Sequence, residues 1–250
     1  MEISFTVCSL SAAPVADFVE KLEENIGNVT FQVVVVCPEP VSFRKTIHVP
    51  ETQNLGNVRG HNLAFEHCEA GVIIASNLDT VHLWDGKTLL EQMAQKEEEV
   101  FPFCGGLNPL DNELFGTCYG LYYPYFPVMT RGSITAIGGW FNNNFIDHFG
   151  DPDVGMRTWW HKGRCELLPQ HCVLSNPPSQ HGKSSRFEKN NFDQDFITFK
   201  QLWHDKFGGY FNTDFRDINF DYCKSLMHQN SLDLGLPPKV VSRLISNLQH

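Results

Sequence analysis

Hydrophobic patterns in the first hundred residues predict alternating strands and helices. Residues 2–10 alternate between apolar and polar side chains, which is typical of a strand, and residues 31–37 form a continuous apolar run, as buried parallel strands do. Residues 16–24 repeat apolar side chains at helical spacing. The same patterns predict, in order, a strand at 46–49, a helix at 59–68 and a strand at 71–76. This order favours a mostly parallel α/β sheet flanked by helices.

The second half of the chain is expected to add strands and a helical end. Residues 85–99 contain a helix with a charged face, and the aromatic residues of 101–129, broken by Gly and Pro, predict further strands. Residues 176–191 are polar, which is typical of a mobile lid, and residues 195–250 look helical and peripheral. Because the chain shows neither an internal repeat nor a linker, we expect a single domain over residues 1–250.

Composition excludes several classes of protein. The formal net charge of −10 argues against nucleic-acid binding, which needs basic patches. No apolar run approaches the roughly 18 residues of a membrane span, and the first ten residues read as a strand without the basic start of a signal peptide. Eight cysteines without a C-x-x-C pair indicate a reducing, cytoplasmic setting. Twenty Phe, six Tyr and five Trp fit either a large core or sugar-stacking surfaces.

The polar cluster Asn77–Thr80, directly after the strand at 71–76, is the most informative stretch of the chain. An acidic residue at the carboxyl end of a strand in an α/β sheet lies at the crevice where such folds bind ligands. Asp79 is such a residue, and its carboxylate suits a hard divalent cation, Mg²⁺ or Mn²⁺. A cation at this place is what a nucleotide diphosphate needs in order to be held and then to leave.

The order of residues around this cluster follows a known pattern. Residues 54–80 read as N-x-G-f-a-x-G-N-N, an apolar strand and N-P-D-T, with Leu78 replacing the proline and His61 replacing the first asparagine of the N-N pair. Residues 130–163 match a second pattern, in which two glycines and a phenylalanine precede E-D-v-D-l-x-x-R-x-x-x-x-G. The residues in register are Gly138, Gly139, Phe145, Asp151, Asp153, Arg157 and Gly163. The departures are Gly150 at the glutamate position and Asn142–Asn143 in place of an acidic pair.

Two shorter segments are similar to further patterns: His181–Ser184 to H-x-g-x-S, and Lys206–Gly209 to K-W-G-G, with Phe207 in place of the tryptophan. Over roughly residues 1–210 the chain resembles the family-2 inverting glycosyltransferases with the GT-A fold, and within them a rhamnosyltransferase-like branch. The resemblance implies a mostly parallel nucleotide-binding sheet flanked by helices, a smaller acceptor-side sheet and a helical C-terminal tail. The expected parts are a nucleotide-sugar-binding half at 1–100, an acceptor and catalytic half at 101–192 and the tail at 193–250.

By this resemblance Asp79 is the leading metal ligand, as the last aspartate of a D-x-D or N-x-D element. Asn77 matches the first member, and would contact Mn²⁺ or Mg²⁺ weakly or touch the sugar; an Asx-turn that ends the strand is the alternative. His181 falls where the family has a histidine that completes the metal shell, with His171 as its substitute. A zinc site is disfavoured because its candidate ligands match no common spacing: His161, Cys165, His171 and Cys172.

The resemblance also makes Asp151 the catalytic base. Inversion needs a base on the face opposite the leaving group, within hydrogen-bond reach of the acceptor hydroxyl. Because Pro152 suits the first position of a helix, Asp151 as a helix cap is an alternative that is compatible with catalysis. Asp153 would bind substrate hydroxyls and is the fallback base. Arg157 would bind phosphate or pair with Asp153 one helical turn away.

The nucleotide is expected against the ends of the first two strands. Ser9 and Leu10 end the first strand. Cys37 stands where the family has an aspartate for the base ring, so Glu39 would take over that contact. Arg59 is a candidate for the diphosphate or the base, because a guanidinium offers paired donors. Two further residues are either nucleotide contacts or turn and cap residues: Asn54 and Asn62.

The function expected from the sequence is metal-dependent inverting glycosyl transfer. A sugar, rhamnose by the branch resemblance, would move from a UDP- or dTDP-linked donor to a glycan or glycoconjugate hydroxyl. A catalytically silent nucleotide- or glycan-binding protein is an alternative, because Gly150, Cys37 and Asn77 depart from the commonest pattern. A sugar-phosphate nucleotidylyltransferase is disfavoured because residues 9–15 lack the glycine-rich basic loop that such enzymes carry.

Overall fold

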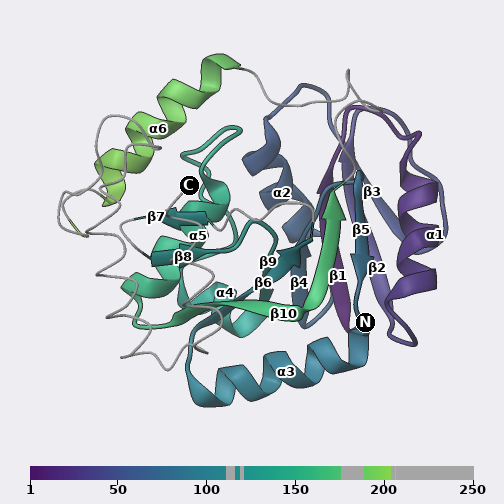
Figure 1. Cartoon of the computed structure of the whole chain (residues 1–250). Helices are drawn as coiled ribbons and strands as arrows, with labels where there is room; N and C mark the ends of the chain where they lie inside the picture. Colours follow the sequence, from purple (N-terminus) through teal and green to yellow (C-terminus); the bar gives the residue numbers. More distant parts are fainter. Residues whose placement is uncertain (111–115, 119–120, 176–188, 204–205, 207–250) are drawn as a thin grey trace.

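The computed structural model describes residues 1–110, 116–118, 121–175, 189–203 and 206. Within these residues, eight strands form one curled sheet in the order β3-β2-β1-β4-β9-β6-β10-β5, and two short strands, β7 and β8, pair separately (Figure 1). The strands are β1 (Ile3–Cys8), β2 (Phe31–Cys37), β3 (Thr46–Pro50), β4 (Val72–Ala75), β5 (Thr80–Leu83), β6 (Phe103–Pro109), β7 (Gly116–Cys118), β8 (Leu121–Tyr123), β9 (Pro127–Thr130) and β10 (Arg164–Ser175). The helices are α1 (Val15–Asn25), α2 (Asn57–Glu66), α3 (Gly86–Glu99), α4 (Arg131–Ala136), α5 (Gly150–Trp160) and α6 (Lys189–Trp203).

The N-terminal half of the sheet is parallel, as the hydrophobic pattern predicts. Strands β3, β2, β1 and β4 run side by side in one direction. All seven residues of β2 are buried, which is the environment that a continuous apolar run requires. The helices and strands expected before residue 100 are confirmed, with ends that differ by no more than about two residues, the ordinary uncertainty of such boundaries.

The other half of the sheet is mixed, and β10 joins its parts. Strand β9 runs antiparallel to both β4 and β6. β10 pairs parallel to β6, with a register shift between Leu168 and Cys172, and from Cys172 onward it also pairs antiparallel to β5, where Ser175 lies opposite Thr80. The end of β10 therefore lies beside the polar turn that follows β4. His181 and most of the expected lid lie outside the described residues, and residues 189–191 begin α6.

Helices cover both faces of the sheet. On one face, α1 and α3 share a buried apolar cluster with Val33 and Val35 of β2; on the other, α2, α4, α5 and α6 share a second cluster with Val34 and Val36. The two sets alternate along β2 because successive side chains of a strand point to opposite faces. None of the helices in the described part of the chain is long and apolar enough to cross a membrane.

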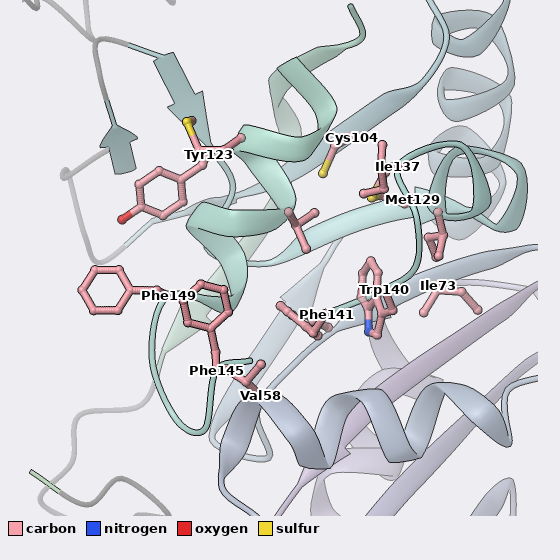
Figure 2. Close-up of a cluster of buried hydrophobic side chains, with 14 of the residues drawn as sticks. Val58, Ile73, Cys104, Tyr123, Met129, Ile137, Trp140, Phe141, Phe145 and Phe149 are labelled. Carbon is pink, nitrogen blue, oxygen red and sulfur yellow. The ribbon is translucent and has the colours of Figure 1, made fainter. Parts of the chain in front are cut away.

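Aromatic packing fixes the start of α5. Figure 2 shows Phe141, Phe145 and Phe149 gathered close to Val58 of α2. Phe149 precedes α5 in a left-handed conformation, with φ of 63°, and its ring centroid lies 5.3–5.6 Å from those of three phenylalanines of α6: Phe192, Phe196 and Phe199. The helix consequently begins at Gly150, and Asp151 lies within its first turn. The alternative in which Asp151 caps this helix is therefore wrong, because Phe149 occupies the cap position.

One buried carboxylate holds the loop that leads into α5. Asp195 of α6 is completely buried and accepts hydrogen bonds from the backbone amides of residues 146–148, at 3.0, 2.9 and 2.9 Å. Asp147 accepts in turn from the amide of Asn57, the first residue of α2, at 2.8 Å, and from the side chain of Asn191 at 2.6 Å. The loop is thereby tied to α2 and to α6 at once.

Replacement of Asp195 should destabilise the fold. Asp195→Ala leaves three backbone amides without their acceptor, and we expect the free energy of unfolding to fall by about 3 kcal/mol or more. Asp195→Asn keeps one acceptor oxygen and should lose less. Urea denaturation measures both changes. Asp193→Ala, at an exposed position of the same helix, is the matched control; equal stability of the Asp195→Ala and Asp193→Ala proteins would contradict the anchoring role.

Candidate active site

A pocket with a volume of about 270 Å³ opens where the end of β4 meets the loop before α5. The pocket is lined by the first turns of α2, by residues 75–77 at the end of β4 and directly after it, by residues 125–126 before β9, by Phe141, and by residues 147–151, which lead into α5. Asn77 and Asp151, which are far apart in the sequence, both line it. The fold thus brings one predicted sugar or metal contact and the predicted base into a single pocket.

The environment of Asp151 changes its acidity. Burial raises the pKa of this carboxyl group from 3.8 to about 7, and a hydrogen bond from its own backbone amide lowers it by less. The carboxylate is favoured only weakly at neutral pH and readily accepts a proton. A general base works best when its pKa lies near the operating pH. The pKa of Asp151 therefore suits a general base, and the residue lines a pocket that can receive a substrate.

Gly150, the departure beside Asp151, has a steric cause. A Cβ atom at this position would lie 2.7 Å from Cδ1 of Phe141 and 2.9 Å from Cγ2 of Val58. The ring of Phe141 also packs against His61, with centroids 5.3 Å apart, and both residues line the pocket. The wall next to Asp151 is therefore aromatic where the family pattern has a second acid. An apolar wall of this kind is what desolvates a neighbouring carboxylate.

The turn after β4 carries the predicted metal ligands. The carbonyl of Asn77 accepts hydrogen bonds from the Thr80 amide at 3.3 Å and from the Thr80 hydroxyl at 2.7 Å. The backbone carbonyl thus closes the turn, and the exposed Asn77 side chain lines the pocket. Asp79 is half-buried in the same turn and lies outside the pocket lining.

The donors in this turn fit a hard cation. Asp79 supplies a carboxylate and Asn77 an amide oxygen, which are the ligand types that Mg²⁺ and Mn²⁺ prefer. Within the described residues, no three His, Cys, Asp or Glu side chains gather as a metal cluster. His171, the substitute for His181, pairs through Nε2 with Gln92 of α3 at 2.7 Å. Burial also lowers the pKa of His171 to about 4.

The predicted nucleotide contacts Ser9 and Glu39 both form hydrogen bonds with the loop that follows β1. Glu39 accepts hydrogen bonds through Oε2 from the hydroxyl of Ser11 at 3.1 Å and the amide of Ala12 at 2.7 Å. Ser9 bonds with its hydroxyl to the Ser11 carbonyl at 2.8 Å, and Leu10 is half-buried between them in the chain. Glu39 therefore shapes the loop after β1, and its contact with a nucleobase stays a prediction.

Residues near the start of α2 also hold loops in place. Asn54 accepts from the Gly56 amide at 3.1 Å, which is the turn role that the sequence left open. Arg59 donates through Nε to the Asn143 carbonyl at 3.2 Å, and Asn62 donates to the Asn143 side chain at 2.9 Å. These bonds connect α2 to the loop before α5. A nucleotide role for Arg59 stays a prediction.

Asp153 and Arg157 form the ion pair that their spacing allows. Arg157 Nε lies 2.7 Å from Asp153 Oδ2, and Trp203 Nε1 donates to Asp153 Oδ1 at 2.9 Å. The guanidinium of Arg157 also donates to three backbone carbonyls of residues 137–140, the glycine segment that contains Gly138 and Gly139. The acceptors are the carbonyls of Ile137, Gly139 and Trp140. Asp153 is completely buried, and neither residue lines the pocket. Their contacts connect α5 to the glycine segment and to α6.

Several pocket residues were not singled out as site residues from the sequence. They include Asp147, His148, Tyr125, Phe126 and Phe141. For the three aromatic residues the only sequence signal was the richness of the chain in Phe, Tyr and Trp, which fits a core equally well, and Asp147 and His148 gave none. Asp195, which anchors the loop, gave no signal because its partners lie nearly fifty residues away.

Comparison with known proteins places the fold. No protein-family model matches the chain, and no curated protein matches it. Among solved structures, residues 1–349 of Staphylococcus aureus TarS in complex with UDP-GlcNAc align with a TM-score of 0.54 and 11% identity, over 99% of this chain and 79% of that chain.

A second similar structure is the mannosyltransferase PcManGT from Pyrobaculum calidifontis, in complex with GDP-Man and Mn²⁺. It aligns with a TM-score of 0.54 and 12% identity, over 99% of this chain and 85% of that chain. At such low identity the likeness bears on the fold alone. It confirms the GT-A fold that the sequence predicts: a mixed, curled sheet flanked by helices, with a parallel N-terminal half.

Proposed function

We propose that this protein is a metal-dependent inverting glycosyltransferase that uses a nucleotide diphosphate sugar as donor. The observation that carries the proposal is the shared pocket, in which Asn77 at the end of β4 and Asp151, with its pKa raised to about 7, line one cavity. The GT-A fold supports it, and so do two structural neighbours that hold UDP-GlcNAc and GDP-Man. More specifically, we propose rhamnose as the transferred sugar and UDP or dTDP as the nucleotide, because the sequence resembles the rhamnosyltransferase-like branch.

The reaction we propose is a single displacement at the anomeric carbon. The acceptor hydroxyl oxygen forms a bond to C1 of the sugar while the bond from C1 to the phosphate oxygen breaks. The hydroxyl proton passes to the carboxylate of Asp151, and the nucleotide diphosphate leaves with the electron pair. Because one nucleophile attacks from the face opposite the leaving group, the configuration at C1 inverts. Phe141 forms an aromatic wall of the same pocket.

Asp79, with help from Asn77, would hold the cation in this proposal. When bound, a divalent cation acts as a Lewis acid that stabilises the charge on the leaving diphosphate. The oxygen donors of the turn after β4 suit such an ion, and the PcManGT neighbour was solved with Mn²⁺. A charge of −10 on the chain makes this local compensation necessary, because the protein as a whole repels the donor.

Replacement of the turn ligands tests the cation site. Ligand binding raises thermal stability by mass action, so we expect Mn²⁺ to strengthen the shift of melting temperature that UDP, dTDP or GDP produces. Asp79→Ala should abolish the Mn²⁺-dependent part, and Asn77→Ala should reduce it less because a neutral amide contributes less charge. A thermal-shift titration with and without Mn²⁺ measures both. An undiminished Mn²⁺ effect in Asp79→Ala would reject this residue as a ligand.

Asp151→Asn tests the base directly. The variant keeps the size of the side chain and removes its ability to take a proton, so transfer should fall by about 10²–10⁴-fold. Donor binding should persist, because Asp151 acts on the acceptor. A product assay with nucleotide sugars measures the rate, and NMR of the product measures the anomeric configuration. Retained configuration would exclude this mechanism, and full activity of the variant would move the base to another residue.

The acidity of Asp151 predicts an unusual effect of pH on stability. Its pKa is higher in the folded protein than its ordinary value of 3.8, so the folded state binds more protons between pH 4 and 7. This group therefore makes the protein less stable as the pH rises through that window. Asp151→Asn removes the effect and should raise the melting temperature at pH 8 more than at pH 4. An identical change at both pH values would show that the pKa is not raised.

A further inference from the structure

A buried chain of hydrogen bonds runs from the core to the turn after β4. The indole Nε1 of Trp84 lies 3.1 Å from Nδ1 of His82, and Nε2 of His82 lies 2.8 Å from Oγ of Ser76. An indole nitrogen can only donate, so Nδ1 must accept and carries no proton. In the neutral ring the proton is then on Nε2, which donates to Ser76. The bonding partners thus fix the tautomer of His82.

From Ser76 the chain continues to the turn itself. The Ser76 hydroxyl, which already accepts from His82, lies 3.0 Å from Oγ1 of Thr80 and 3.4 Å from the carbonyl of Asn77. The Thr80 hydroxyl donates to the same carbonyl at 2.7 Å. Each donor in the series has an acceptor, and the series ends on the carbonyl that closes the 77–80 turn. Such buried networks hold their members in one arrangement when all are satisfied.

The position of His82 is itself set by the core. Its ring is 1% exposed and lies between aromatic rings, with centroid distances of 5.2 Å to Phe5, 5.9 Å to Phe18 and 5.6 Å to Trp84. Along β5, Thr80 and His82 are both buried, as alternate residues of a strand on one face are. Strand β5 therefore places the His82 ring, which packs against β1 and α1, on the buried side of the 77–80 turn. The exposed side chain of Asn77 lies on the other side of this turn.

We propose that His82 is a positioning residue that holds the 77–80 turn, and with it the side chains of Asn77 and Asp79, in the arrangement that receives the diphosphate and its cation. The inference rests on the proposed function for its ligand and on the hydrogen-bond chain for its geometry. His82 contacts no substrate. It acts through the donation from Nε2 to Ser76.

Two substitutions distinguish the hydrogen bond that His82 donates to Ser76 from the role of its ring in packing the core. In His82→Gln the amide nitrogen takes the place of Nε2 and can still donate to Ser76. In His82→Asn the shorter side chain can accept from Trp84 but does not reach Ser76. Leu89→Ala, a buried position of α3 on the same face of the sheet, is the control for a general loss of stability.

The first readout needs no ligand. Hydrogen exchange of the Thr80 amide, which bonds to the Asn77 carbonyl, reports opening of the turn. We expect exchange to rise at least about tenfold in His82→Asn relative to Leu89→Ala, and to stay within about threefold of the native rate in His82→Gln. An unchanged Thr80 amide in folded His82→Asn, or an equal rise in Leu89→Ala, would overturn the proposal.

The second readout tests the consequence for the ligand. The Mn²⁺ concentration that gives half of the thermal shift in the presence of UDP or GDP should rise at least about tenfold in His82→Asn and be rescued in His82→Gln. A looser turn with unchanged Mn²⁺ dependence would leave His82 with a structural role only and overturn the positioning role. If the native protein shows no Mn²⁺-dependent shift with any nucleotide, the proposed function fails, while hydrogen exchange still decides whether His82 holds the turn.

Discussion

The candidate active site depends on the buried carboxylate of Asp195, which lies outside the pocket lining. Asp195 gathers three consecutive backbone amides of the loop 146–148, and this loop supplies Asp147 to the start of α2 and leads into α5. Backbone amides that are buried in a loop need acceptors, and here a single side chain from α6 provides them. The placement of Asp151 is therefore decided by a helix that lies beyond the pocket along the chain.

The position of Asp151 after this loop also explains why the pKa of its carboxyl group is raised to about 7. Asp151 lies at the first turn of a helix, where the backbone favours a negative charge. Burial outweighs that preference and raises its pKa, and the aromatic side chains around the pocket supply the apolar surroundings. The rigid aromatic cluster between α2 and α5 thus has a chemical effect as well as a structural one (Figure 2).

How much the sequence could predict follows from the range of the interactions involved. Strand β2 was predicted with its observed ends because six of its seven residues are apolar, the exception being Gln32. The motif order also predicted that Asn77 and Asp151 belong to one site, and both line the pocket. The sequence placed Pro152 at the first position of α5, whereas the helix begins at Gly150, directly after Phe149, which packs against α6. The buried chain through His82 was missed as well, since its hydrogen-bond partners, Ser76 and Trp84, form no recognised motif and the rings that pack on it come from β1 and α1.

Gly150 links two positions that look independent in the sequence. The space that a side chain would need at residue 150 is filled by Phe141 and Val58, and Phe141 is at the same time a wall of the pocket. A side chain at position 150 therefore requires both Phe141 and Val58 to move or to be replaced by smaller residues. Because these side chains leave no room at position 150, the pocket has, among the described residues, only one ionisable group at the start of α5, the carboxyl group of Asp151.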